Sequence, residues 1–330
     1  MMISIGFLFV WCGLFLKSFG RGGGMIPAVS LGGSYFLGRS ESRESIASQA
    51  SQASISGGGI SVGGQVLDDL ELFCDELLSK NFLGSGKGLD SNFSQRVTIP
   101  RAESWAYEQY RNVADGIECL SKEAQVDILK NIAASKPDNV SVMIQGVDVP
   151  LNEVTAESVG SEAINALVLT GSDGGFSQDQ EGRISIKINP ERYGEAFLCL
   201  CSLKDKFKED VSHTKLMLPS VVGSGPEDAV IYLNNISRVD DVVSELSQVE
   251  GMLRASENGI FFMDELAPGV YKGVLPKEAY STDEAGAAGS LGMYYSKLAV
   301  KAAAYSLTQA VPSREAAEFV LEQAGLRVEK

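Results

Sequence analysis

The sequence predicts an α+β protein in which a mixed or antiparallel sheet is flanked by helices. Residues 183–188 (RISIKI) alternate strictly between polar and apolar side chains, which is typical of a strand. Valine and leucine recur at helical spacing over residues 239–249. From the first of these segments to the second, the patterns follow the order strand, helix, strand, strand, helix, and this order favours an α+β arrangement.

Residues 1–64 are predicted to form a flexible, disordered arm. Ser, Gly, Gln and Ala dominate residues 30–64, and such a composition has too little apolar surface to offset the entropy lost on ordering. The same composition is typical of type III secretion signals and of plain flexible linkers, so it does not by itself choose between them.

An apolar run, residues 3–16, lies near the start of this arm. A membrane-spanning helix needs about 20 apolar residues, and no basic residue precedes the run as it would in a signal peptide. Three interpretations compete: a weak secretory signal, a membrane anchor, or sequence translated upstream of a true start at Met25. We favour the last, so that residues 1–24 are not part of the mature protein.

Residues 65–135 are predicted to be a helical segment. Apolar residues recur at helical spacing from Val66 to Leu78, with carboxylates on the opposite face. Two more helices are expected at residues 103–118 and 121–135, where apolar positions again follow a helical period.

Residues 136–330 are predicted to form the α+β domain. After the strand at residues 183–188, Asn189 and Pro190 suit the cap and the first position of a helix. Further strands are expected at residues 139–146, 214–218 and 228–233, and further helices at residues 239–249, 289–307 and from Ser313 onward.

Charge and rare residue types exclude several classes of function. The 330-residue chain has a net charge of -15, so nucleic acid and anionic membrane surfaces repel it and neither is an expected partner. His213 is the single histidine, which excludes mechanisms that need two imidazoles, including most zinc hydrolases. Five widely spaced cysteines predict buried, reduced thiols. We expect no metal site and no cofactor.

Three stretches in order resemble the HopPsyA-type family of type III effectors from plant-associated bacteria. They are RISIKINPERYGEAFLCL, DAVIYLN, and LAPGVYKGVLP followed by GSLGMYYSKLAVKAA. In that family a strand runs into an N-P-E helix start, followed by a D-x-x-[IV]-Y strand, an apolar-Pro-Gly-[VI] turn and an S-[FL]-G helix start. The resemblance covers residues 125–310.

The resemblance implies a secreted protein that reaches the host cell cytoplasm through a type III apparatus. There it would act on a host protein that the sequence does not name, and resistant plants would detect it by a hypersensitive cell-death response. The family also uses a small acidic secretion chaperone, and the segment from Ile60 to Leu83 is our candidate for its binding site. The alternative for this segment is that its apolar stripe packs on the domain.

The fold of this family is related to that of phosphothreonine lyases, which raises the alternative of an eliminative enzyme. Such chemistry needs a base, usually Lys, an acid, usually His, and cations that hold the phosphate. Lys215 is the candidate base, and His213, two residues away and on the same face of a strand, is the candidate acid. Arg183 and Lys187 are the candidate anion-binding residues.

The sequence departs from the lyase pattern at two places. Ser185 and Lys187 stand where lyase-like relatives have a His or an equivalent donor, and Pro226 and Glu227 stand where a phosphate-clamping Arg is expected. Glu227 and Asp228 would repel a phosphate. We therefore expect an effector that acts through protein interactions rather than catalysis, with a lyase or a conventionally secreted binding protein as alternatives.

Overall fold

The computed structural model describes residues 60–83, 92–112, 121–135, 140–144, 147–148, 166–171, 180–219, 221–276 and 290–329. Nearly all of the predicted N-terminal arm, including the apolar run and Met25, lies outside the described residues. All described residues belong to one structural unit.

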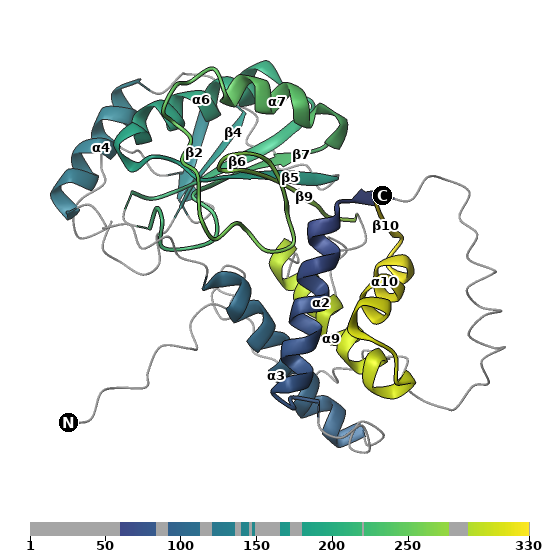
Figure 1. The fold of residues 1–330 in the computed structure, drawn as a ribbon. Coiled ribbons are helices and arrows are strands. Elements are labelled where there is room, and N and C mark those ends of the chain that lie inside the picture. Colours follow the sequence, from purple (N-terminus) through teal and green to yellow (C-terminus); the bar gives the residue numbers. More distant parts are fainter. Residues whose placement is uncertain are drawn as a thin grey trace, which may run out of the picture. The chain divides into compact units, whose positions relative to one another are not determined.

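The domain is built around an antiparallel sheet of eight strands (Figure 1). In the order in which they lie in the sheet, the strands are β3 (Val147–Asp148), β2 (Val140–Ile144), β4 (Ala166–Gly171), β6 (Val211–Met217), β7 (Ala229–Leu233), β5 (Gly182–Ile186), β9 (Val270–Val274) and β8 (Asp264–Ala267). Every neighbouring pair in this sheet is antiparallel. The α+β prediction is therefore confirmed, and of its two sheet types the structure has the antiparallel one.

Strand β5 lies inside the sheet between β7 and β9, and all of its residues are buried. The strand leads directly to Asn189, whose side chain accepts a hydrogen bond from Glu191 N at the start of a 3-10 turn, Pro190–Arg192. Helix α6 (Tyr193–Lys206) follows this turn. The capping role predicted for Asn189 is confirmed, because its side chain satisfies a backbone donor at the helix start.

Helices α4 (Lys122–Ser135), α6 and α7 (Val239–Leu246) cover one face of the sheet, as Figure 1 shows. The isoleucines of the 183–188 segment point into this first core, and Phe197, Leu200 and Leu203 of α6 pack there with them. The cysteines Cys199 and Cys201 of α6 are buried and form no disulfide, as is the case for Cys74, so the prediction of buried thiols is confirmed for these three.

A second core joins helices α2 (Gly64–Ser79), α3 (Asn92–Arg111), α9 (Leu291–Gln309) and α10 (Ser313–Gln323) to strand β9. Strand β1 (Ile60–Val62) pairs in parallel with β10 (Leu326–Val328), which brings the two ends of the described chain together. The composition of residues 30–64 does not indicate β1, because its three residues become a strand only through this pairing across the length of the domain.

Helix α3 differs from the helix predicted at residues 103–118. It begins at Asn92, ends at Arg111 and contains Pro100 in its interior. Proline removes one backbone hydrogen bond there. The helix nevertheless continues, because Ala102, Ala106 and Tyr110 recur every four residues and are all buried in the second core.

Asp69 of α2 anchors the turn that precedes β8. Its carboxylate accepts hydrogen bonds from Phe262 N at 2.6 Å and from Gln65 Nε2 at 2.8 Å. Phe262 has a φ of 63°, in the left-handed region that residues other than glycine seldom adopt, and its ring packs against Phe73 and Tyr295. Burial raises the pKa of Asp69 to about 6.

The turn between β8 and β9 contains the Pro-Gly pair of the family-like motif. Gly269 has a φ of 77°, and a Cβ at this position would lie 2.1 Å from the carbonyl oxygen of Arg254. A side chain is therefore excluded by contact as well as by backbone conformation. This close approach also lets Gly269 O accept a hydrogen bond from Lys187 N, just beyond β5.

Candidate functional site

The face of the sheet opposite the first core carries polar side chains from three adjacent strands. Arg183 of β5 and His213 of β6 both pair with Tyr232 of the intervening strand β7. In the next row, Ser185 and Lys215 both pair with a valine of β7, Val230. Because neighbouring strands lie about 4.8 Å apart, the structure brings Arg183, His213 and Lys215 together on one face.

Glu227, two residues before β7, lies at the centre of this group. Its Oε1 atom accepts hydrogen bonds from Ser185 Oγ at 3.0 Å and from Tyr110 Oη at 2.9 Å. Arg183 Nη2 donates to the same oxygen and forms an ion pair with it, and it also donates to Tyr110 Oη at 2.7 Å. The side chains of Arg183 and Glu227 are only 6% and 11% exposed.

Sequence reasoning missed Tyr110 entirely and interpreted Glu227 only as a charge that repels phosphate. Tyr110 lies 73 residues before Arg183 and 117 residues before Glu227, on a helix of the second core. The strict alternation of residues 183–188 contained a usable signal. It placed Arg183 and Ser185 on one face of a strand, where a buried arginine requires an acidic partner.

Lys215 lies in the electrostatic field of this cluster. Burial lowers the pKa of its ammonium group, and Arg183 and Arg111 lower it further, while attraction to Glu227 acts in the opposite direction. The lowered pKa is a property that a catalytic base needs. This is the observation that most favours the lyase alternative.

His213 stacks on the ring of Tyr232, with 4.1 Å between the ring centroids and 14° between the planes. Its Nδ1 lies 3.0 Å from Ser212 Oγ. Burial, followed by repulsion from Lys204 and Lys215, lowers the pKa of His213 to about 4. The imidazole is therefore neutral at pH 7 and lacks the additional proton that a general acid would give to a leaving phosphate.

Lys187 is fully buried, and its Nζ donates a hydrogen bond to the carbonyl oxygen of Gly225 at 3.1 Å. The structure thus places this candidate anion-binding residue against the loop that leads to Glu227. Its ammonium helps to hold that loop.

Asp228 fixes the other side of the same loop. Its carboxylate is completely buried and accepts hydrogen bonds from Ile188 N at 3.0 Å and from Gly223 N at 2.6 Å. Arg254 forms an ion pair with it at 3.0 Å. Asp228 is therefore committed to positioning the loop backbone, and with it the residue next in the chain, Glu227.

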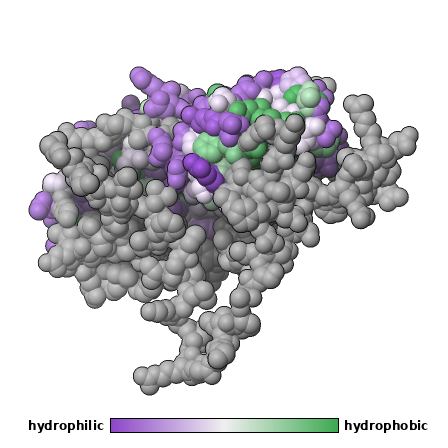
Figure 2. All heavy atoms as spheres, turned by 90° about the horizontal axis from the view of Figure 1, so that it is seen from below, coloured by the Kyte–Doolittle hydropathy of each residue, from purple (hydrophilic) through white to green (hydrophobic). Residues whose placement is uncertain are grey.

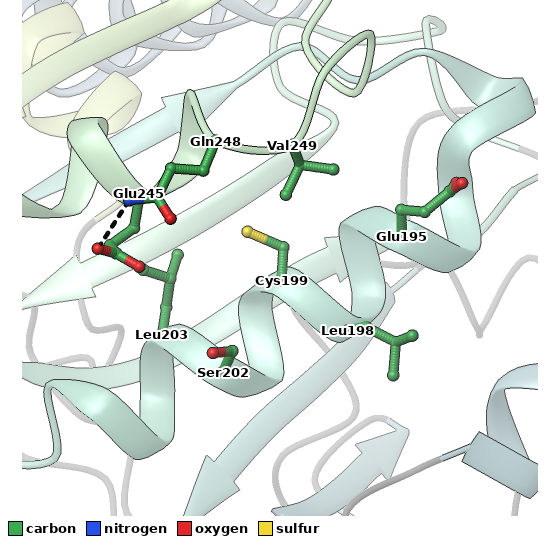
Figure 3. A pocket seen from close by; sticks show the side chains of 8 residues that line it. All are labelled: Glu195, Leu198, Cys199, Ser202, Leu203, Glu245, Gln248 and Val249. Carbon is green, nitrogen blue, oxygen red and sulfur yellow. Dashed lines mark hydrogen bonds between the residues drawn. The ribbon is translucent and has the colours of Figure 1, made fainter.

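A shallow groove of about 370 Å³ lies elsewhere, between α6 and the end of α7 (Figure 3). It is lined by Glu195, Leu198, Cys199, Ser202, Leu203, Glu245, Gln248 and Val249. Burial raises the pKa of the Cys199 thiol to about 11, so the thiol remains protonated and is a poor nucleophile. The groove therefore lacks an activated nucleophile.

Figure 2 shows one face of the molecule, on which the described residues expose hydrophobic side chains beside hydrophilic ones. The large hydrophobic side chains that are most exposed in the described ranges are Leu72, Leu198 and Leu266, at 44%, 41% and 39%. They belong to α2, α6 and β8, respectively. Single exposed leucines of this kind occur on most protein surfaces.

Metal binding and membrane spanning are two further possibilities for the described part of the chain. No group of three or more His, Cys, Asp or Glu side chains there could hold a metal ion. No helix there is both long enough and apolar enough to cross a membrane.

The fold is shared with two bacterial effector proteins of known structure. The effector protein from Pseudomonas syringae pv. syringae strain 61 matches 79% of this chain and 94% of its own, with a TM-score of 0.55 and 14% identity. The effector protein from Pseudomonas syringae pv. tomato strain DC3000 matches 68% of this chain and 91% of its own, with a TM-score of 0.54 and 18% identity. No protein-family model matches this chain, and no curated protein matches it significantly.

Proposed function

We propose that this protein is a bacterial type III effector that enters plant host cells, as the sequence resemblance implies, and acts there by binding a host protein. The observation that carries this proposal is the fold shared with two Pseudomonas syringae effector proteins, over 79% and 68% of this chain. The ordered motifs at residues 183–200, 228–234 and 266–303 and the Ser-rich leader support it independently. Recognition by a resistant plant would then produce a hypersensitive response.

Two features of the site favour binding over eliminative catalysis. Glu227 already occupies Arg183, which would otherwise be available to a substrate phosphate. The acid candidate, His213, is neutral at pH 7 because its pKa is lowered to about 4. A lyase would need both the open cation and the protonated imidazole at the same time.

The segment Ile60–Leu83 remains our proposed binding site for a small acidic secretion chaperone. In the folded domain, Val66, Leu70, Phe73 and Leu77 of α2 are buried in the second core. A chaperone that binds the same apolar face of α2 therefore competes with α9 and α10 for this face. We propose that the chaperone binds before α2 docks on the domain.

Export is tested with a translocation reporter fused to two forms of the chain, one starting at Met1 and one at Met25. We expect the reporter to reach the host cytosol only from bacteria with a working type III apparatus. If Met25 is the true start, as we proposed from the sequence, the Met25 fusion is translocated as well as the Met1 fusion. Equal export by bacteria without the apparatus, dependent on residues 1–24, would instead identify a conventionally secreted protein.

Catalysis is tested directly with phosphothreonine peptides and the purified protein. We expect no elimination product by mass spectrometry, and no difference between the wild type and Lys215→Ala. Glu227 already pairs with the arginine that would hold the substrate phosphate, and the neutral His213 has no additional proton to give to the leaving phosphate. A product that appears with the wild type and disappears with a folded Lys215→Ala variant would establish the lyase alternative.

A further inference from the structure

The contacts of Glu227 are those of a bound anion. One carboxylate oxygen receives a charged donor, Arg183, and two hydroxyl donors, Ser185 and Tyr110. These donors come from β5 and α3, whereas Glu227 lies in the loop before β7. Charge-assisted donors that converge from separate elements on one oxygen are the usual construction of an oxyanion site.

We infer that Arg183, Ser185, Tyr110 and Lys215 form a binding site for an oxyanion of the phosphomonoester class, and that Glu227 is an internal substitute that closes it. The inference concerns the folded domain alone. It does not depend on whether the protein is exported as proposed above.

The charges around the site support a ligand with more negative charge than one carboxylate. Arg183 and Arg111 each repel the Lys215 ammonium, and Glu227 is the carboxylate to which Lys215 is attracted. Within the described ranges no hydrogen bond or ion pair to the Lys215 ammonium is found. Among the described residues whose charges act on Lys215, two arginines and one carboxylate are found, and a phosphate dianion would balance the three cations, Lys215 included, better than Glu227 alone.

Among the described residues, the tyrosines and the histidine of this face do not supply further negative charge. Tyr107 and Tyr110 stack on each other, and burial raises the pKa of Tyr110 well above its ordinary value. Burial also raises the pKa of Tyr232, so both phenols stay neutral. His213 is neutral at pH 7, and Lys204 of α6, which repels the charged form of His213, adds positive charge.

Opening the site requires only the Glu227 side chain to move. The backbone of the loop is held by Asp228 through Gly223 N and Ile188 N, and by Lys187 through Gly225 O. The Glu227 side chain, by contrast, is linear and rotates about its own bonds. Replacing it with a short side chain should therefore leave the cation and the hydroxyl donors in place around a vacated position.

The inference is tested by chemical rescue of Glu227→Ala. The melting temperature is measured at pH 7 and equal ionic strength in chloride, acetate and inorganic phosphate. We expect the variant to melt below the wild type in chloride and to gain about 3 °C in ~20 mM phosphate, as a ligand with millimolar affinity would produce. Acetate should give a smaller gain, and the wild type should not respond, because its own carboxylate fills the site.

Double variants assign the effect to the named residues. Glu227→Ala combined with Arg183→Met should lose the response to both anions. Glu227→Ala combined with Lys215→Met should keep the response to acetate but lose the preference for phosphate. Glu245→Ala serves as a matched control, because it also removes one glutamate, but from the exposed pair with Lys206.

Two results would overturn the inference. One is a melting temperature of Glu227→Ala that is the same in chloride, acetate and phosphate. The other is phosphate binding by the wild type that is as tight as that of the variant, which would show that Glu227 does not occupy the site. If Glu227→Ala does not fold, Glu227→Gln is titrated with phosphate in a calorimeter, with and without Arg183→Met. A binding heat that is absent, or that is the same with and without Arg183→Met, counts against the site.

Discussion

Arg183→Met is expected to destabilise the domain by about 3–5 kcal/mol, because it leaves the Glu227 carboxylate without its cation in a position where that side chain is only 11% exposed. The hydroxyl groups of Tyr110 and Ser185 would remain as donors, but neither carries a charge. The free energy of unfolding from urea titration measures the loss.

The double variant Arg183→Met, Glu227→Gln separates an uncompensated charge from lost packing. It should recover most of the lost stability, because a neutral pair replaces the buried ion pair without leaving a charge behind. Lys206→Met is the matched control, since its partner Glu245 lies at the surface and exposed pairs contribute little. A loss in Arg183→Met no larger than in this control would show that Glu227 is solvated without Arg183.

Asp69→Asn is expected to stabilise the domain at pH 7 relative to the wild type, and to have little effect at pH 4. Asparagine can still accept the hydrogen bond from Phe262 N, but it carries no charge in the second core. Burial raises the folded-state pKa of Asp69 from 3.8 to about 6. Between those two pH values the folded state therefore binds more protons than the unfolded state, and the wild type loses stability as pH rises.

The size of the effect follows from the same shift. One pKa unit corresponds to about 1.4 kcal/mol, so the stability difference between Asp69→Asn and the wild type should grow by roughly 2–3 kcal/mol from pH 4 to pH 7. Urea unfolding at several pH values measures it. Asp68→Asn removes a neighbouring, exposed carboxylate from the same helix and controls for the change in net charge. Parallel stability curves for Asp69→Asn and the wild type would contradict the prediction.

Sequence patterns place Arg183 correctly, because the alternation of residues 183–188 puts it on the polar face of a strand. They place Asp69 wrongly, on the polar face of its helix, whereas the structure buries Asp69, which is 4% exposed, against the turn at Phe262. Neither pattern reveals a partner. Glu227 lies 44 residues from Arg183, and Phe262 lies 193 residues from Asp69.

The sequence by itself determined the local elements of this protein. Strand β5, the cap at Asn189, helix α6 and helix α7 follow from side-chain periodicity and backbone preferences within about fifteen residues, and these preferences are local. The same local information placed His213 and Lys215 on one strand face and selected the α+β class.

The tertiary structure decided everything that depends on distant parts of the chain. It made the sheet wholly antiparallel, formed β1 by pairing it with β10, and carried α3 through Pro100 because three of its side chains are buried. It also brought Tyr110 into hydrogen-bond contact with Arg183, and it placed the Glu227 carboxylate in an ion pair with Arg183. The physical reason is that burial and charge pairing depend on which surfaces meet, and sequence period fixes only which face each residue presents.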